Sequence, residues 1–300
     1  MTSMILSYPL RDKTAFITGD RGIGLEIAIR LARAGANIVI AGKTTQAHDK
    51  LPGTIYTAAD LVRQAGGKAL PIACDIRNEE DIKYAVRKSV ETFGGIDILV
   101  NNASALNYAS TEKTERSRFG LVYDVNVEGT FFLTKHIIPH LKRSDIAHVL
   151  TLSPPLPEIL SSEWIAKWIA INPGYSITKV DMSLLSRAWA EEFKSDGIRF
   201  NTLWPESIIN TAALTLLPGS RALINASRKP AIMADAAYGI LTVTDRTMSG
   251  KHFVDVGALE TLLDQTDFSD YATVPGEALM LDWYIDKPIS KCPFVEPGGQ

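Results

Sequence analysis

Tyr175 and Lys179 stand four residues apart, a spacing that puts both side chains on one helix face, about one turn apart. The pKa of a free tyrosine lies near ~10, so a phenol exchanges protons poorly at neutral pH. A cation beside the ring favours the phenolate and lowers that pKa. The pair is therefore a candidate proton donor and acceptor for carbonyl and alcohol chemistry. The alternative is one partly buried ring and one solvated amine.

The composition is that of an ordinary globular protein. The chain has 300 residues, of which 46% are hydrophobic and 22% charged, with a formal net charge of -3. This mild acidity argues against a nucleic-acid partner, and no apolar run predicts a membrane span or a signal segment. Cys74 and Cys292 lack metal-ligand spacing, so we expect no metal site and no disulfide scaffold. We expect a cytoplasmic or other intracellular reducing compartment.

Short apolar runs alternate with amphipathic stretches along the chain. This pattern predicts an α/β fold with a single doubly wound, Rossmann-type parallel sheet and helices on both faces. The predicted strands are 14–18, 37–41, 69–74, 96–100, 148–153, 199–203 and 252–256. The predicted helices are 22–33, 79–93, 115–141, 175–193 and 234–241. We expect this domain to span residues 1–257, and residues 258–300 to form an irregular tail packed on it.

Two segments are longer than a simple connection needs. Residues 44–57 include Pro52 and Gly53, and residues 154–174 contain four prolines together with Trp164 and Trp168. Loops of such length in compact domains are usually functional or disordered. The tryptophans predict that the second segment, residues 154–174, forms an ordered flap.

Gly19, Gly22 and Gly24 lie between the first predicted strand and its helix, with Arg21 and Ile23 among them. Glycines in this position let the backbone approach a pyrophosphate, whose charge is favoured by the helix N-terminus. A tight turn without a ligand is the alternative. The strand before and the helix after supply the context that a dinucleotide site requires.

The end of the second strand decides between the nicotinamide cofactors. An acidic residue there would bond the adenosine ribose and repel a 2′-phosphate. This chain has Lys43 instead, and Lys43 with Arg21 could meet a phosphate dianion, so NADP(H) is favoured over NAD(H). A solvated surface lysine is the alternative. Asp75, Asn102 and Ala103 would border the adenine and ribose, or serve as turn residues.

Together these motifs resemble those of the short-chain dehydrogenase/reductases, over residues 12–257. The resemblance rests on the glycine loop, Asp75-Ile76, the stretch 101–103, Asn126 and the Tyr175–Lys179 pair. Within this family the chain further resembles the hydroxysteroid dehydrogenase-like protein 2 branch, in stretches 43–59, 66–71, 153–156, 204–205 and 234–238. Animal members of that branch carry a C-terminal sterol-carrier domain, which we expect this chain to lack.

The resemblance implies a catalytic tetrad of Asn126, a serine, Tyr175 and Lys179. Tyr175 would pass a proton to the substrate oxygen while a hydride leaves the nicotinamide. Lys179 would hold the nicotinamide ribose and lower the tyrosine pKa, Asn126 would position a water, and the serine would polarise the carbonyl. The family pattern further implies cofactor contacts at Asp75, Ile76, Asn102, Ala103, Pro205 and Thr211. Without a ligand, Asn126 would be a backbone-satisfied helix amide and Thr211 a helix cap.

Three departures from the family pattern stand out. The glycine loop is one residue short and places Asp20 where a phosphate should lie. The position of the usual catalytic serine is Pro154, so we expect Ser153 to take its place, with Ser162 as the alternative. Glu206 stands where the family has glycine. These departures agree with either a specialised enzyme or a decayed one.

An aromatic and aliphatic pocket lining predicts a small hydrophobic substrate, such as a fatty-acyl, terpenoid or steroid-like carbonyl or alcohol. The expected border residues are Trp164, Trp168, Trp204, Leu214, Leu216 and Leu217. Packing of the core or of a subunit interface is the alternative. Trp189 and Phe193 lie where family members pair helices between subunits, which implies a homodimer or homotetramer.

Two rival functions remain open. One is a catalytically impaired family member that acts as a nucleotide- or lipid-binding or scaffold protein. The other is a nucleotide-binding enzyme of another class, such as a methyltransferase, which the Tyr175–Lys179 pair disfavours.

Overall fold

The computed structural model describes residues 9–47, 53–217 and 219–287. Within these residues, seven strands form one parallel sheet in the order β3-β2-β1-β4-β5-β6-β7. The strands are β1 (Thr14–Thr18), β2 (Asn37–Gly42), β3 (Lys68–Ala73), β4 (Ile98–Asn101), β5 (His148–Thr151), β6 (Arg199–Trp204) and β7 (His252–Val254). The strand order reverses direction between β1 and β4, where doubly wound sheets open a ligand crevice. The predicted fold class is confirmed.

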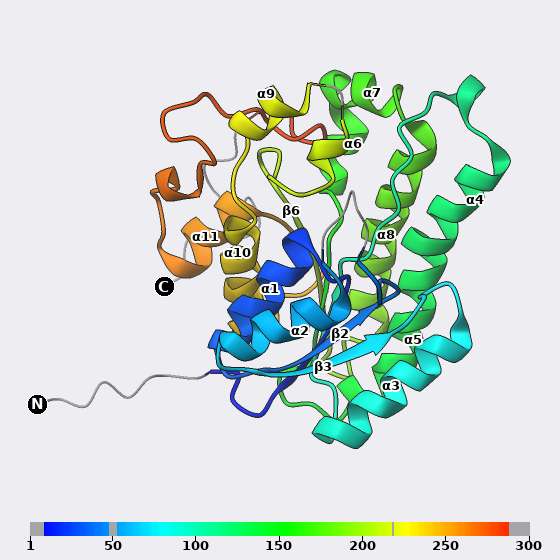
Figure 1. Ribbon diagram of the computed structural model, residues 1–300, viewed down its shortest axis with the longest axis vertical. Coiled ribbons are helices and arrows are strands. Elements are labelled where there is room, and N and C mark those ends of the chain that lie inside the picture. Colours follow the sequence, from blue (N-terminus) through cyan, green and yellow to red (C-terminus); the bar gives the residue numbers. More distant parts are fainter. Residues whose placement is uncertain (1–8, 48–52, 218, 288–300) are drawn as a thin grey trace, which may run out of the picture.

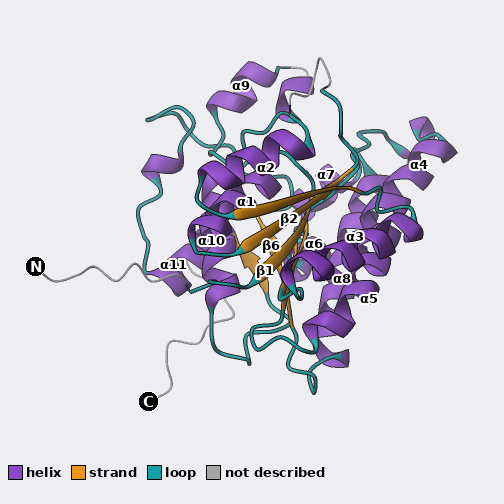
Figure 2. Cartoon of the chain, turned by 60° about the horizontal axis from the view of Figure 1, so that its bottom comes forward, coloured by secondary structure: helices purple, strands orange, loops and turns teal. Residues whose placement is uncertain are grey.

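Helices cover both faces of this sheet (Figures 1 and 2). One buried cluster joins the sheet to α1 (Gly22–Arg33), α2 (Ile55–Gln64), α10 (Ala231–Thr242) and α11 (Asp255–Leu263). The other joins it to α3 (Glu79–Phe93), α5 (Thr130–Leu141) and α8 (Pro173–Glu192). The remaining helical segments are η1 (Thr111–Lys113), α4 (Arg116–Tyr123), η2 (Asp124–Gly129), α6 (Leu156–Ser161), α7 (Glu163–Ile169), η3 (Leu214–Leu216), α9 (Ser220–Asn225) and η4 (Ser269–Tyr271).

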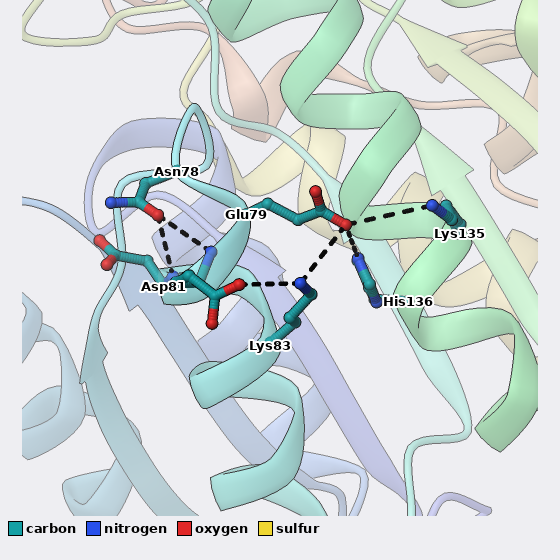
Figure 3. A network of polar contacts seen from close by, with 7 residues as sticks. Asn78, Glu79, Asp81, Lys83, Lys135 and His136 are labelled. Atoms are coloured by element: carbon teal, nitrogen blue, oxygen red, sulfur yellow. Dashed lines mark hydrogen bonds and ion pairs between the residues drawn. The ribbon is translucent and has the colours of Figure 1, made fainter.

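The start of α3 shows how local sequence fixes an element. The Asn78 side chain accepts hydrogen bonds from the backbone of Glu80 and Asp81 and so caps the helix. Glu79 reaches Lys83 on the same helix and His136 on α5, with 2.7 Å to the His136 ring nitrogen (Figure 3). Solvent reaches these groups and weakens each pair, so the pairs add little to stability.

Four segments differ from the sequence expectation. The helix predicted over 115–141 is interrupted by the π-helical turn η2, and α2 begins inside the segment predicted as an insertion because Thr54 caps it. The long segment after β5, predicted as an ordered flap, contains the two short helices α6 and α7. Helix α11 continues past Gly257, so the irregular tail starts only after the left-handed Asp264. The structure does not describe Pro52, Cys292 or the end of the tail.

Trp189 does not lie on the surface, as an interface role would require. It is buried among Phe131, Phe200 and the second core cluster. Amphipathic spacing alone could not distinguish the core-facing side of α8 from a face that meets another subunit.

No helix in the described ranges has both the length and the apolar content that a membrane crossing demands.

Candidate active site

Tyr175 and Lys179 project inward from the first turns of α8. Their side chains are buried, with residue exposures of 6% and 3%. The Lys179 Nζ donates to the Leu152 carbonyl at 2.9 Å and lies 5.5 Å from the centre of the Trp204 ring. The pair therefore sits at the carboxyl ends of β5 and β6, at the same sheet edge as the glycine loop that follows β1.

Burial sets the protonation of both groups. It lowers the pKa of Lys179 to about 7, because a buried ammonium loses its hydration. Burial also raises the pKa of Tyr175 well above its ordinary value; Tyr284, Tyr108 and Asp282 add to this effect, and a hydrogen bond with Ser104 opposes it. The expected lowering of the Tyr175 pKa by Lys179 is therefore reversed here, because burial penalises the charged phenolate.

The two candidate serines differ in what their hydroxyls do. The Ser162 oxygen accepts from the Ile165 backbone N–H at 3.3 Å and caps α7. The Ser153 hydroxyl is fully buried and has no hydrogen-bond partner among the described residues. Such an unpaired group is costly unless a ligand or water completes it. Ser153, next to the carbonyl that Lys179 binds, is thus the better placed candidate.

Ser104 is a polar neighbour of Tyr175 that sequence reasoning missed. Its only signal is its position directly after Asn102 and Ala103. Asn126 fixes this neighbourhood from the η2 turn: its Oδ1 accepts from the Ala105 N–H at 2.8 Å, and its Nδ2 donates to the Ala105 carbonyl and the Thr178 hydroxyl. These bonds join the chain after β4 to α8 and give Asn126 a clear structural role.

The glycine loop has the shape of a cradle. Gly19 and Gly22 adopt φ angles of +97° and +54°, in the left-handed region that side chains disfavour. A Cβ on Gly19 would lie 2.6 Å from the Asn102 amide nitrogen, and one on Gly24 would collide with the same amide. That amide is held by its bond to the Thr18 carbonyl at 2.7 Å.

The N-terminus of α1 is open toward this cradle. No side chain of the described residues caps it at Arg21, so the first N–H groups of the helix are free for an anion. Thr211 stands over the turn, since a Cβ on Gly22 would come within 3.2 Å of its methyl group. The structure therefore brings Thr211, predicted from a distant motif, to the glycine loop.

Asp20 and Arg21 modify the cradle. The Asp20 carboxylate is buried. One of its oxygens has no hydrogen bond within the described residues and forms an ion pair with the Arg21 guanidinium at 3.6 Å. Burial raises the pKa of Asp20 and Arg21 opposes the rise. Arg21 also donates to the Gly53 carbonyl at 3.1 Å, so the insertion anchors it. The acid in the turn is thus partly neutralised from within the loop.

Two cations, Lys43 and Arg77, lie where β2 and β3 end. Lys43 is exposed, and both it and Arg77 lower the pKa of Asp75, with Arg77 the larger cause. Arg77 grips Asp75 with two guanidinium nitrogens. Sequence reasoning missed Arg77, which lies two residues past the predicted adenine border. Nearby, the Ala103 N–H donates to the Thr18 hydroxyl, and Ile76 packs beneath Gly129.

The residue after Pro205 has a structural use. Glu206 is buried and pairs with Arg228 at 2.9 Å, and its N–H donates to Asp255 at 2.9 Å. Burial raises the pKa of Asp255 to about 7. The glutamate that replaces the family's glycine therefore fastens the end of β6 to the elements that follow.

The tail also returns to the site, which the sequence did not reveal. Asp282 accepts from the Trp204 indole N–H at 2.7 Å, and the Tyr284 hydroxyl bonds that of Ser176 at 2.8 Å, one residue from Tyr175. Of the other expected pocket residues, Leu214 and Leu217 are half-buried at the turn η3. The structure does not describe the Leu216 side chain.

These features fit a nicotinamide dinucleotide. The glycine cradle and open helix end suit a pyrophosphate, and the unpaired Ser153 hydroxyl lies beside a buried phenol and amine. The described residues contain no cluster of three metal-ligating side chains.

Comparison with known proteins gives concordant matches. A family model described as Enoyl-(Acyl carrier protein) reductase matches residues 17–238. The hydroxysteroid dehydrogenase-like protein 2 of Xenopus laevis is 48% identical over 278 residues, covering 91% of this chain and 64% of that protein. The human protein of that name is 45% identical, with 91% and 63% coverage. The chain thus spans somewhat less than two thirds of these relatives.

Two solved structures match along nearly their whole length. A putative dehydrogenase from Xanthomonas campestris is 44% identical with a TM-score of 0.86, covering 93% of this chain and 99% of that one. A short chain dehydrogenase from Mycobacterium thermoresistibile is 43% identical with a TM-score of 0.85, covering 95% and 98%.

Proposed function

Because the chain belongs to the short-chain dehydrogenase/reductase family of oxidoreductases, we propose that it is an NADP(H)-dependent enzyme interconverting a carbonyl and an alcohol. Its substrate is hydrophobic: a fatty-acyl, terpenoid or steroid-like compound. One observation carries the proposal. The Tyr175 phenol and the Lys179 amine are buried together on one helix face, at the sheet edge that also presents the glycine cradle.

Tyr175 acts as the proton donor in reduction. Its raised pKa means that the phenol carries its proton at neutral pH and can release it to an oxygen that gains negative charge. Ser153 donates a hydrogen bond to the same substrate oxygen. Lys179 holds Ser153 and Tyr175 in position, because its amine donates to the carbonyl of Leu152, the residue before Ser153. The cofactor, when bound, supplies or accepts the hydride.

The cofactor is held by the residues around the cradle. Gly19, Gly22 and Gly24 admit the pyrophosphate, and Thr211 closes over it. Positions 41–44, at the end of β2, contain Lys43 and no acidic residue, which supports the choice of NADP(H) over NAD(H).

Replacing Tyr175 tests the proposal. In Tyr175→Phe we expect kcat to fall by about 10²- to 10⁴-fold, because proton transfer is lost, while the Kd for NADPH stays within about twofold. Tyr84→Phe, which changes an exposed ring on α3, is the matched control. Unchanged turnover in Tyr175→Phe would remove this residue from the mechanism.

A second candidate is an impaired member that binds nucleotide or lipid without turnover. Two features favour this second candidate. A buried Asp20 oxygen in the glycine turn has no hydrogen bond among the described residues, and position 154 is proline. Fluorescence titration with NADPH separates the two: absence of binding at millimolar cofactor would favour the impaired protein.

We further propose a homodimer or homotetramer in an intracellular reducing compartment. Leu184 on α8 and Phe131 on α5 are 52% and 40% exposed, which supports an apolar contact between copies. The buried thiol of Cys74, whose pKa burial raises to about 12, agrees with a reducing environment. Light scattering at two protein concentrations measures the oligomeric state.

A further inference from the structure

Five aromatic rings form a continuous row from the surface to the buried phenol. The row, which we call the aromatic row, consists of Trp164, Trp168, Trp283, Tyr108 and Tyr175. Neighbouring ring centres lie 5.9, 5.4, 5.1 and 6.3 Å apart in that order. Trp164 is 47% exposed at one end, and Tyr175 is 6% exposed at the other.

Two rings of the row are exposed apolar side chains: Trp164 at 47% and Tyr108 at 42%. Trp168 and Trp283 connect these two rings to one another. Leu160 and Leu106, which precede Trp164 and Tyr108 in the sequence, are also exposed. Exposed apolar side chains that gather in one place mark binding sites more often than isolated ones do. The inner end meets the residue proposed to transfer the proton.

The central ring comes from the C-terminal segment, residues 264–287. In Figure 1 this segment, orange to red, returns past α9 toward α6 and α7. Trp283 stacks on Trp168 with their planes only 10° apart and meets Tyr108 edge-on. On either side of it, Asp282 bonds Trp204 and Tyr284 bonds Ser176. Trp283 is thereby fixed between α7 and the loop after β4.

We propose that the aromatic row is the wall that binds the apolar part of the substrate, and that Trp283 is its specificity-determining residue. The inference rests on the proposed function and narrows the substrate to an extended hydrocarbon chain with a neutral carbonyl or alcohol at the inner end. A row of adjoining rings that leads from the exposed Trp164 to the buried Tyr175 suits a chain lying along it. Asp282 disfavours a carboxylate at the inner end, since like charges there are poorly screened.

A homologous series of substrates tests the proposal. For straight-chain aldehydes with NADPH, we expect kcat/KM to rise by about fourfold per added methylene while the chain extends along the row. In Trp283→Ala this slope should flatten, because the central ring of the wall is lost. Trp283→Phe, which keeps a ring at this position, should keep most of the slope. Tyr56→Ala, at an exposed ring on α2, is the control.

Calorimetric titration with hexanol, octanol and decanol makes the test independent of turnover. If the affinity of the wild type rises with chain length and that of Trp283→Ala does not, the inference stands even where no aldehyde is reduced, and only the proposed function falls. An equal chain-length dependence in a folded Trp283→Ala protein would overturn the inference, as would its absence from the wild type.

Discussion

The two halves of the site are built in different ways. The region that we propose for the cofactor, called the cofactor half, consists of residues 18–24 with Asn102 and Thr211. It takes its form from backbone shape: positive φ angles and a space that admits no Cβ. The region that we propose for the substrate, called the substrate half, consists of Trp168, Trp204, Arg228 and residues 264–287. It is held by side chains from segments far apart in the sequence.

This difference implies different vulnerabilities. In the cofactor half the main hazard is added volume, because the backbone is closely packed around the glycine turn. In the substrate half the main hazard is an unpaired buried charge, because Glu206, Arg228 and Asp255 meet with little solvent. Substitutions in each half can break or sharpen the comparison.

The largest effect should come from Arg228→Met. Removing the guanidinium leaves Glu206 buried without its partner at 2.9 Å, and we expect a loss of about 3–5 kcal/mol in unfolding free energy. Urea denaturation measures it. The double variant Glu206→Gln with Arg228→Met should recover most of the loss. A single variant as stable as the wild type would show that the ion pair does not hold the substrate half.

The pH dependence of stability should change in Asp255→Asn. The folded-state pKa is raised from 3.8 to about 7, so the folded chain binds more protons than the unfolded chain between these values. This group therefore lowers stability as pH rises from about 4 to 7. The asparagine keeps the acceptor oxygen for the Glu206 N–H. The unfolding free energy of the variant, measured relative to that of the wild type, should therefore be higher at pH 8 than at pH 4 by up to about 4 kcal/mol. Parallel stability curves for variant and wild type from pH 4 to 8 would refute the buried charge.

In the cofactor half, Gly24→Ala should weaken NADPH binding. The new Cβ would displace the Asn102 amide from the Thr18 carbonyl, and overpacking of this kind costs about 1–3 kcal/mol. We expect a Kd about 10- to 100-fold higher in a fluorescence titration. Gly120→Ala, where an added Cβ meets nothing within 4 Å, is the matched control. Equal affinities would mean that this turn does not carry the cofactor.

The smallest effect should come from Lys43→Asp, because the side chain is exposed and solvent screens its charge. We expect the ratio of NADPH to NADH affinity to fall by about tenfold, since the new carboxylate would repel a 2′-phosphate. Lys68→Asp, at the amino-terminal end of β3 and so at the other end of the strands, controls for net charge. If the preference for NADP(H) persists, another cation such as Arg77 sets it.

The same comparison explains what the sequence could predict. The sheet, the glycine turn, Lys43 and the Tyr175–Lys179 pair follow from contiguous patterns, and the family resemblance is confirmed by the relatives. The contributions of Arg228, Trp283 and Tyr284 depend on contacts across tens to more than a hundred residues, for which no local pattern exists. The sequence did not predict that the Tyr175 pKa is raised. Burial is the largest cause, and Tyr284 and Asp282 of the C-terminal segment add to it.

The most direct test is a crystal structure of the chain with NADPH bound. The account predicts the pyrophosphate over Gly22 at the start of α1, and the nicotinamide ring within reach of the Tyr175 hydroxyl. A nucleotide bound elsewhere, or a glycine turn closed by the Asp20 carboxylate at saturating NADPH, would contradict it.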